Sequence, residues 1–212
     1  MSCPICNKRR AKRFCPARGE NICPVCCGTE REATIDCPSE CSYLASSRRY
    51  DFDRKPVDWK KVPFAEVRIP QEFAATHGLL LAALISSAWK YARDHRQVVD
   101  SDVIAAFQAL AVTYRTLSSG LYYEEPPEYL YRRELYNALK AGVDEFKQSE
   151  TQRLGMVATR DGDIRDALTF LTQLGSLHEN GRPKGRAFLD LMRSQVAPDE
   201  TAKPASNIVL LR

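Results

Sequence analysis

Apolar side chains recur at intervals of three or four residues through most of the chain beyond residue 72. This period places them on one face of an α-helix, and there is little of the strict alternation that is typical of strands. The densest apolar run covers residues 79–89. The helix that contains it, predicted over 72–95, should therefore be the most buried element of a helical body.

Helix start and stop signals divide the rest of this body into four more helices. Asp100 offers an N-cap to a second helix that ends at Gly120, and a third helix begins after Pro127. A fourth begins near residues 161–163, and a fifth covers 184–196. The sequence thus predicts a mainly α fold, in which a small cysteine-rich module is followed by a bundle of about five helices.

Composition divides the chain into four parts. Residues 1–45 contain all eight cysteines and are predicted to form a zinc-binding module, and residues 73–196 form the α-helical domain. Between them, residues 46–72 contain three prolines and mixed charge without a sustained apolar period. That composition is typical of a linker, with a short strand or turn around 64–69. Residues 197–212 are expected to be a loose tail.

The spacing of the first cysteines is that of metal ligands. In a reducing compartment thiols persist as metal thiolates rather than as disulfides. Cys3 and Cys6 form one C-x2-C pair, and after sixteen intervening residues Cys23 and Cys26 form another. Because each pair makes a tight knuckle that supplies two sulfurs of a tetrahedron, the four together predict a structural zinc site.

The remaining cysteines allow a second site that interleaves with the first. This interleaved order over residues 3–41 resembles the cross-brace zinc modules, such as the HIT and MYND fingers. Two alternatives stay open: one zinc ion in a treble-clef or ribbon module with spare thiols, and an iron–sulfur cluster, which uses the same ligands. We expect zinc as the cofactor, with two ions favoured over one. The ligands of the second site would be Cys15, Cys27, Cys37 and Cys41.

The module is too poor in apolar residues to fold on a hydrophobic core alone. Residues 1–45 contain Phe14, Ile22 and Ile35 and few other large apolar side chains. Zinc must then supply folding free energy, on the order of 10 kcal/mol for each structural site.

A basic run lies inside the module. Residues 1–62 hold 13 Lys and Arg against 8 Asp and Glu, whereas residues 63–212 hold 18 against 19. A run of this kind predicts contact with the phosphates of nucleic acid. Because zinc–thiolate centres are anionic, the same cations could instead compensate the charge of the metal site. The candidate nucleic-acid-binding residues are Lys8, Arg9, Arg10, Lys12 and Arg13.

Two features of the helical domain predict further binding surfaces. Arg182, Lys184 and Arg186 lie in the turn before the fifth helix, where cations and backbone N–H groups would suit an anion. Six of the nine tyrosines fall between residues 114 and 136, beside Arg132. Tyrosine with arginine makes a good contact surface for protein or nucleic acid, although about half of these rings should belong to the core.

Enzyme and membrane classes find no support in the sequence. No phosphate-binding loop, dinucleotide fingerprint or hydrolase motif is present, and the three histidines lie far apart. No apolar run approaches the roughly 20 residues that span a bilayer, and the first ten residues lack the apolar stretch of a secretory signal. We therefore expect a cytoplasmic protein that is not an enzyme, has no small-molecule substrate and does not bind membranes.

The function that these features favour is that of a zinc-binding adaptor. Its module would contact nucleic acid or a protein partner, and the helical domain would supply a second surface. The alternative is a cysteine-based redox or metal sensor, in which oxidation of the vicinal Cys26 and Cys27 releases zinc and unfolds the module.

Overall fold

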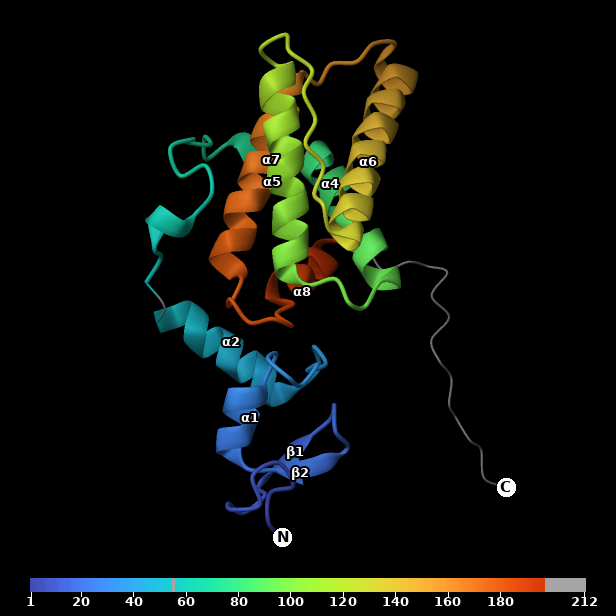
Figure 1. Ribbon diagram of the computed structural model, residues 1–212. Coiled ribbons are helices and arrows are strands. Elements are labelled where there is room, and N and C mark those ends of the chain that lie inside the picture. Colours follow the sequence, from blue (N-terminus) through green and yellow to red (C-terminus); the bar gives the residue numbers. More distant parts are fainter. Residues whose placement is uncertain (55, 197–212) are drawn as a thin grey trace, which may run out of the picture.

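The computed structural model describes residues 1–54 and 56–196 (Figure 1). A two-stranded antiparallel hairpin, β1 (Arg13–Cys15) and β2 (Glu20–Ile22), leads into the short helix α1 (Pro24–Glu30). These elements and the N-terminal loop form the module at one end of the molecule (Figure 1).

Helices make up the rest of the described chain, and they confirm the predicted mainly α fold. Helix α2 lies between the module and the bundle, and the bundle is built mainly from α4, α5, α6 and α7 (Figure 1). Among the described residues no helix is both long and apolar enough to cross a membrane. The helices are α2 (Ser42–Arg54), a 3-10 turn (Trp59–Lys61), α3 (Phe73–Thr76), α4 (Gly78–Asp94), α5 (Asp100–Leu117), α6 (Leu130–Leu154), α7 (Asp161–His178) and α8 (Ala187–Gln195).

The core of the bundle follows the apolar period of the sequence. Helix α5 packs most extensively on α7 and on α6, and α4 packs on α6. Phe107 of α5 and Phe188 of α8 are fully buried and meet edge to face, with 6.4 Å between ring centroids. The five predicted helices are therefore observed, except that the first is divided at His77 into α3 and α4.

The predicted linker is shorter than the composition indicates. Helix α2 continues through Arg54, nine residues into the segment 46–72, although that part of the chain has no apolar stripe. Polar side chains attach this helix to other segments, as Arg48 does through Glu32 and Asp190. Around 64–69 the chain forms turns rather than a strand, and Gln173 Nε2 of α7 donates to the carbonyl oxygens of Phe64 and Val67. The predicted tail 197–212 lies outside the described residues.

Gly175 allows α7 to approach its neighbours closely. A Cβ atom at this position would lie 2.7 Å from Cγ1 of Ile104 in α5 and 2.8 Å from Cε1 of Phe188 in α8. Both distances are far below van der Waals contact, and both side chains are buried. The absence of a side chain is therefore what lets three helices meet here.

We expect Gly175→Ala to lower the free energy of unfolding by about 1–3 kcal/mol, because the added methyl group must displace core side chains. Gly162→Ala in the same helix is the matched control, since a Cβ there meets nothing within 4 Å. Its better helix propensity should raise stability by up to about 1 kcal/mol. Urea unfolding measures both variants, and equal responses would contradict the close approach at Gly175.

Candidate metal centre

The N-terminal loop brings Cys3 and Cys6 to one side of a tight knuckle. The backbone N–H of Asn7 donates to the carbonyl oxygen of Cys3, and the N–H of Cys3 donates to that of Arg9, each over 2.8 Å. Asn7 adopts a left-handed conformation with φ of 51°, which asparagine tolerates better than most residues. The chain therefore turns back on itself directly after the second cysteine.

The second pair is built into the start of α1. Cys23 is the N-cap of this helix, and its Sγ accepts a hydrogen bond from the backbone N–H of Cys26 over 3.4 Å. Pro24 occupies the first helical turn, where its fixed φ suits a helix and its missing N–H is not needed. The N–H of Cys23 itself donates to Cys3 Sγ over 3.2 Å, which links the two pairs.

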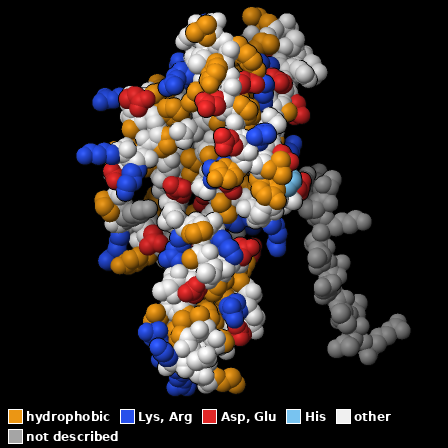
Figure 2. All heavy atoms as spheres, viewed as in Figure 1, with side chains coloured by type: hydrophobic (Ala, Val, Ile, Leu, Met, Phe, Trp, Pro, Cys, Tyr) orange, Lys and Arg blue, Asp and Glu red, His pale blue; other side chains and the backbone are white. Residues whose placement is uncertain are grey.

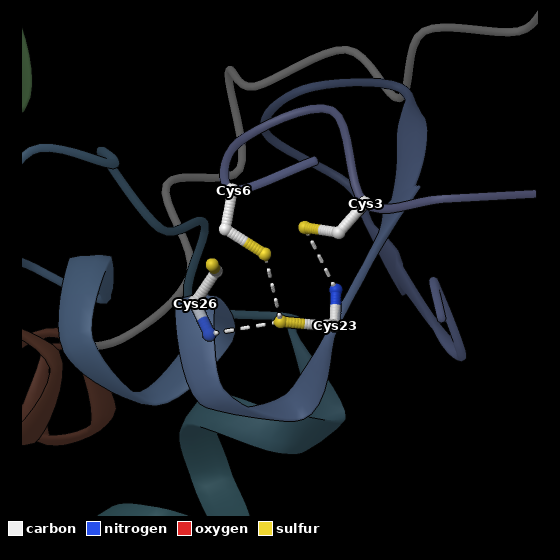
Figure 3. Close-up of side chains that lie close together, drawn as sticks. All are labelled: Cys3, Cys6, Cys23 and Cys26. Carbon is white, nitrogen blue, oxygen red and sulfur yellow. Dashed lines mark hydrogen bonds between the residues drawn. The ribbon is translucent and has the colours of Figure 1, made fainter. Parts of the chain in front are cut away.

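The four sulfurs converge on one point (Figure 3). All of them lie within 4.8 Å of one another, and Cys6 Sγ and Cys23 Sγ are 3.9 Å apart. A tetrahedral ion with metal–sulfur bonds of about 2.3 Å holds its sulfurs about 3.8 Å apart. The geometry therefore fits a single zinc-sized ion. A polynuclear iron–sulfur cluster needs more room between its thiols, because several of its own iron and sulfur atoms lie between them.

Backbone donors and burial act in opposite directions on these thiols. The N–H groups of Lys8 and Arg9 lower the pKa of Cys6 to about 6. Burial acts to raise the pKa of Cys3, but hydrogen bonds from backbone N–H groups, that of Cys23 first, outweigh it and the pKa is lowered. Burial raises the pKa of Cys26 to about 12. A metal ion must therefore displace a proton from at least Cys26, and acid should weaken binding.

Sulfur takes the place of hydrocarbon inside the module. The buried cluster consists of Cys3, Cys15, Ile22, Cys23, Cys26 and Ile35, with further cysteines and Ile5 packed against it. Two of the few large apolar residues of the module are exposed instead, Phe14 by 55% and Val25 by 48%. The small apolar interior fits the expectation that a metal supplies folding free energy, which stays a prediction.

The other four cysteines do not converge in the same way. Burial raises the pKa of Cys37, and the charges of Cys41, Glu32 and Cys15 add to the rise. Cys27 accepts hydrogen bonds from Arg13 Nη1 at 3.8 Å and from Arg31 Nη2 at 3.6 Å. Within the described residues, one group of thiols is close enough for a metal ion, that of Cys3, Cys6, Cys23 and Cys26. The second zinc site stays a prediction.

Most of the basic run is exposed to solvent. Lys8, Arg9, Arg10 and Lys12 lie on the surface of the module. Arg13 is half-buried, because its guanidinium bonds to Cys27 and lies 4.7 Å from the ring centre of Tyr43. The run therefore divides into four side chains that face solvent and one that takes part in the packing of the module.

The module is joined to the bundle through Glu32, which the sequence does not single out. This carboxylate is 1% exposed, and the backbone there has an unusual positive φ of 49°. Its Oε1 accepts from Arg48 Nη2 of α2, and its Oε2 accepts from Asn180 Nδ2, each over 2.6 Å. Arg48 Nη1 also reaches Asp190 of α8 over 2.6 Å. A network of buried polar contacts therefore links the module, α2 and the bundle.

The cations that were predicted to bind an anion also lie at this junction. Arg182 Nη1 donates to the carbonyl oxygens of Gly28 and Arg31 in the module. Lys184 Nζ donates to Thr34 O over 2.8 Å, and Arg186 Nη1 donates to Arg96 O over 2.6 Å. In the structure these side chains therefore hold backbone carbonyls of the same chain, which leaves binding of an anion as an untested prediction.

The tyrosine cluster divides between surface and core, as expected. The hydroxyl groups of Tyr136 and Thr113 lie 3.0 Å apart inside the bundle. On the outside, Arg132 lies over the ring of Tyr129 at 5.1 Å and Lys140 over that of Tyr122 at 5.8 Å. Tyr114 and Tyr136 are buried, whereas Tyr122, Tyr123, Tyr129 and Tyr131 are exposed.

We expect the purified protein to contain zinc, and a strong chelator to unfold residues 1–41 while the bundle stays folded. Elemental analysis would give one ion for each chain if the four-thiol site acts alone, and two if the other cysteines close around a second. Amide hydrogen exchange should show protection of β1 and β2 lost upon chelation or in Cys26→Ser. A hairpin that stays protected without metal would contradict the need for an ion.

We expect Arg48→Met to lower the free energy of unfolding by about 2–4 kcal/mol. The substitution leaves the buried carboxylate of Glu32 without its cation, a loss that typically costs 3–5 kcal/mol, and Asn180 offsets part of it. The neighbouring Arg49 is exposed, so Arg49→Met is the matched control and should change stability by less than about 0.5 kcal/mol. Chemical unfolding compares the two, and a loss equal to the control's would show that the network contributes nothing.

Comparison with known proteins finds no relative of this chain. No protein-family model matches the chain, and neither a curated protein nor a solved structure matches it significantly. The geometry of the four-thiol site and of the surfaces around it is therefore the basis for assigning a function.

Proposed function

We propose that this protein is a zinc-stabilised adaptor without enzymatic activity, whose module contacts nucleic acid and whose helical domain supplies a second surface. The observation that carries the proposal is the set of exposed cations beside the four-thiol site. Lys8, Arg9, Arg10 and Lys12 are all solvent-exposed. Lys and Arg side chains gather at the end of the module that lies away from the bundle (Figure 2).

The positions of these cations favour phosphate contact over charge compensation. Among the described residues, the guanidinium groups that reach a sulfur are those of Arg13 and Arg31, at Cys27. Four thiolates around one zinc ion carry a net charge of about −2. Four cations directed to solvent exceed that charge, so the surface keeps a positive excess that attracts a polyanion.

The acidic residues of the module lie where they do not neutralise this surface. Glu20 pairs with Arg18 over 2.6 Å, outside the run of four cations. Glu30 accepts the hydroxyl hydrogen of Thr34, and Glu32 is buried at the junction with the bundle. Three of the five acidic residues of the module therefore have partners other than the four exposed cations.

The environments of the histidines support a function without catalysis. Each imidazole stacks on an aromatic ring: His77 on Phe73, His95 on Tyr91 and His178 on Phe52, with ring centroids 4.0 to 5.5 Å apart. The backbone carbonyl of Tyr91 lies 2.8 Å from His95 Nδ1. These contacts give the imidazoles roles in packing.

A redox sensor is the second candidate, and the position of Cys27 favours it. This thiol is half-buried, directly follows Cys26 of the four-thiol site, and accepts hydrogen bonds from two guanidinium groups. Mild peroxide should then release zinc from the wild-type module but not from Cys27→Ser. If peroxide releases no zinc where a strong chelator does, the sensor function is excluded.

We expect the zinc-loaded protein to bind nucleic acid with an affinity that falls steeply with salt. Fluorescence anisotropy with labelled oligonucleotides between about 50 and 200 mM salt measures the slope. The double variant Arg9→Glu, Lys12→Glu should weaken binding at least tenfold and flatten the slope. Lys60→Glu, Lys90→Glu removes the same charge from exposed positions outside the module and should bind almost like the wild type. Equal losses in both variants would contradict a site on the module.

A further inference from the structure

We propose that the module binds single-stranded rather than duplex nucleic acid, with Phe14 as the platform on which an unpaired base stacks. The inference rests on the proposed function and names its ligand class. It starts from an exposed aromatic ring on the hairpin of the module, two residues after the exposed cation Lys12.

Strand geometry fixes the outward direction of Phe14. Successive side chains of a strand point to opposite faces, and the neighbours Arg13 and Cys15 point into the module, towards Cys27 and the buried sulfur cluster. Phe14 therefore points outward and is 55% exposed. The hairpin gives it a fixed position, because Phe14 pairs with Asn21 of β2 in the antiparallel register.

The surroundings of the ring match the chemistry of a nucleotide. Lys12 is exposed and, two residues before Phe14, continues the same face of the chain. Asn21 is exposed across the strand pair, where its amide offers both a donor and an acceptor to the edge of a base. A stacking ring, a polar amide and the exposed cation Lys12 thus occupy one face of the hairpin.

A single strand fits this face better than a duplex does. Proteins that bind single strands combine a basic surface with aromatic rings, because an unpaired base offers its flat face for stacking. A duplex hides those faces and is read mainly through its grooves by a helix or ribbon that enters them. Here the nearest helix, α1, is seven residues long, and its first turn carries the thiols of Cys23 and Cys26.

The test compares a labelled twelve-nucleotide deoxythymidine strand with a twelve-base-pair duplex, using the full zinc-loaded chain and fluorescence anisotropy at low salt. We expect tighter binding of the single strand, and at least a fivefold loss of that binding in Phe14→Ala, as is typical for one stacked base. Duplex binding should not change in this variant. Phe52→Ala is the matched control, because Phe52 is an exposed phenylalanine on α2, outside the module.

Two further variants guard against a folding effect of the alanine substitution. Phe14→Trp keeps an aromatic face and should retain affinity, whereas Phe14→Leu keeps a large apolar side chain without the ring and should bind as weakly as Phe14→Ala. Zinc content, measured on each protein, should equal that of the wild type. If the leucine and tryptophan variants bind the strand equally well, stacking on Phe14 is excluded.

The outcomes separate this inference from the proposed function. If the strand and the duplex bind equally and Phe14→Ala changes neither, the stacking inference is overturned, while binding of nucleic acid by the cations stands. If neither nucleic acid binds, the proposed function fails and the inference fails with it. A preference for the strand that Phe14→Ala abolishes supports both.

Discussion

The convergence of four thiols is the constraint on which the arrangement of the N-terminal module depends. The knuckle at Cys3 and Cys6, the hairpin and the start of α1 share almost no hydrocarbon interior beyond Ile22 and Ile35. A metal ion bound by the four sulfurs would tie these segments together with a free energy that so few apolar contacts cannot supply. Cys23 is also the N-cap of α1, so the start of that helix and the four-thiol site share one residue.

The position of α1 in turn determines how the module meets the bundle. The chain leaves this helix through Arg31 and Glu32, and Glu32 is buried against α2 and the turn before α8. Carbonyl groups of the same segment accept hydrogen bonds from Arg182 and Lys184. The cysteine-rich module is therefore joined to the helical domain by directional polar contacts, which need one defined orientation.

The sequence predicts what depends on local spacing and misses what depends on distant pairing. The apolar period and the C-x2-C pairs are local, so the helices of the bundle and the ligands Cys3, Cys6, Cys23 and Cys26 could be identified. Helix α2 could not, because it has no apolar stripe and is held through Arg48 by residues of other segments. Likewise, nothing near Arg182 indicates that it donates to carbonyl groups about 150 residues away in the module.

A sulfur-lined interior also changes what an exposed apolar residue implies. In an ordinary small domain, a phenylalanine that the core cannot accommodate is common on the surface and needs no explanation. In this module the inward positions of β1 belong to Arg13 and Cys15, so the residue between them faces solvent whatever its identity. A polar side chain at position 14 would serve the fold equally well. The ring is therefore not explained by folding, and it lies on the same face of the hairpin as the exposed Lys12.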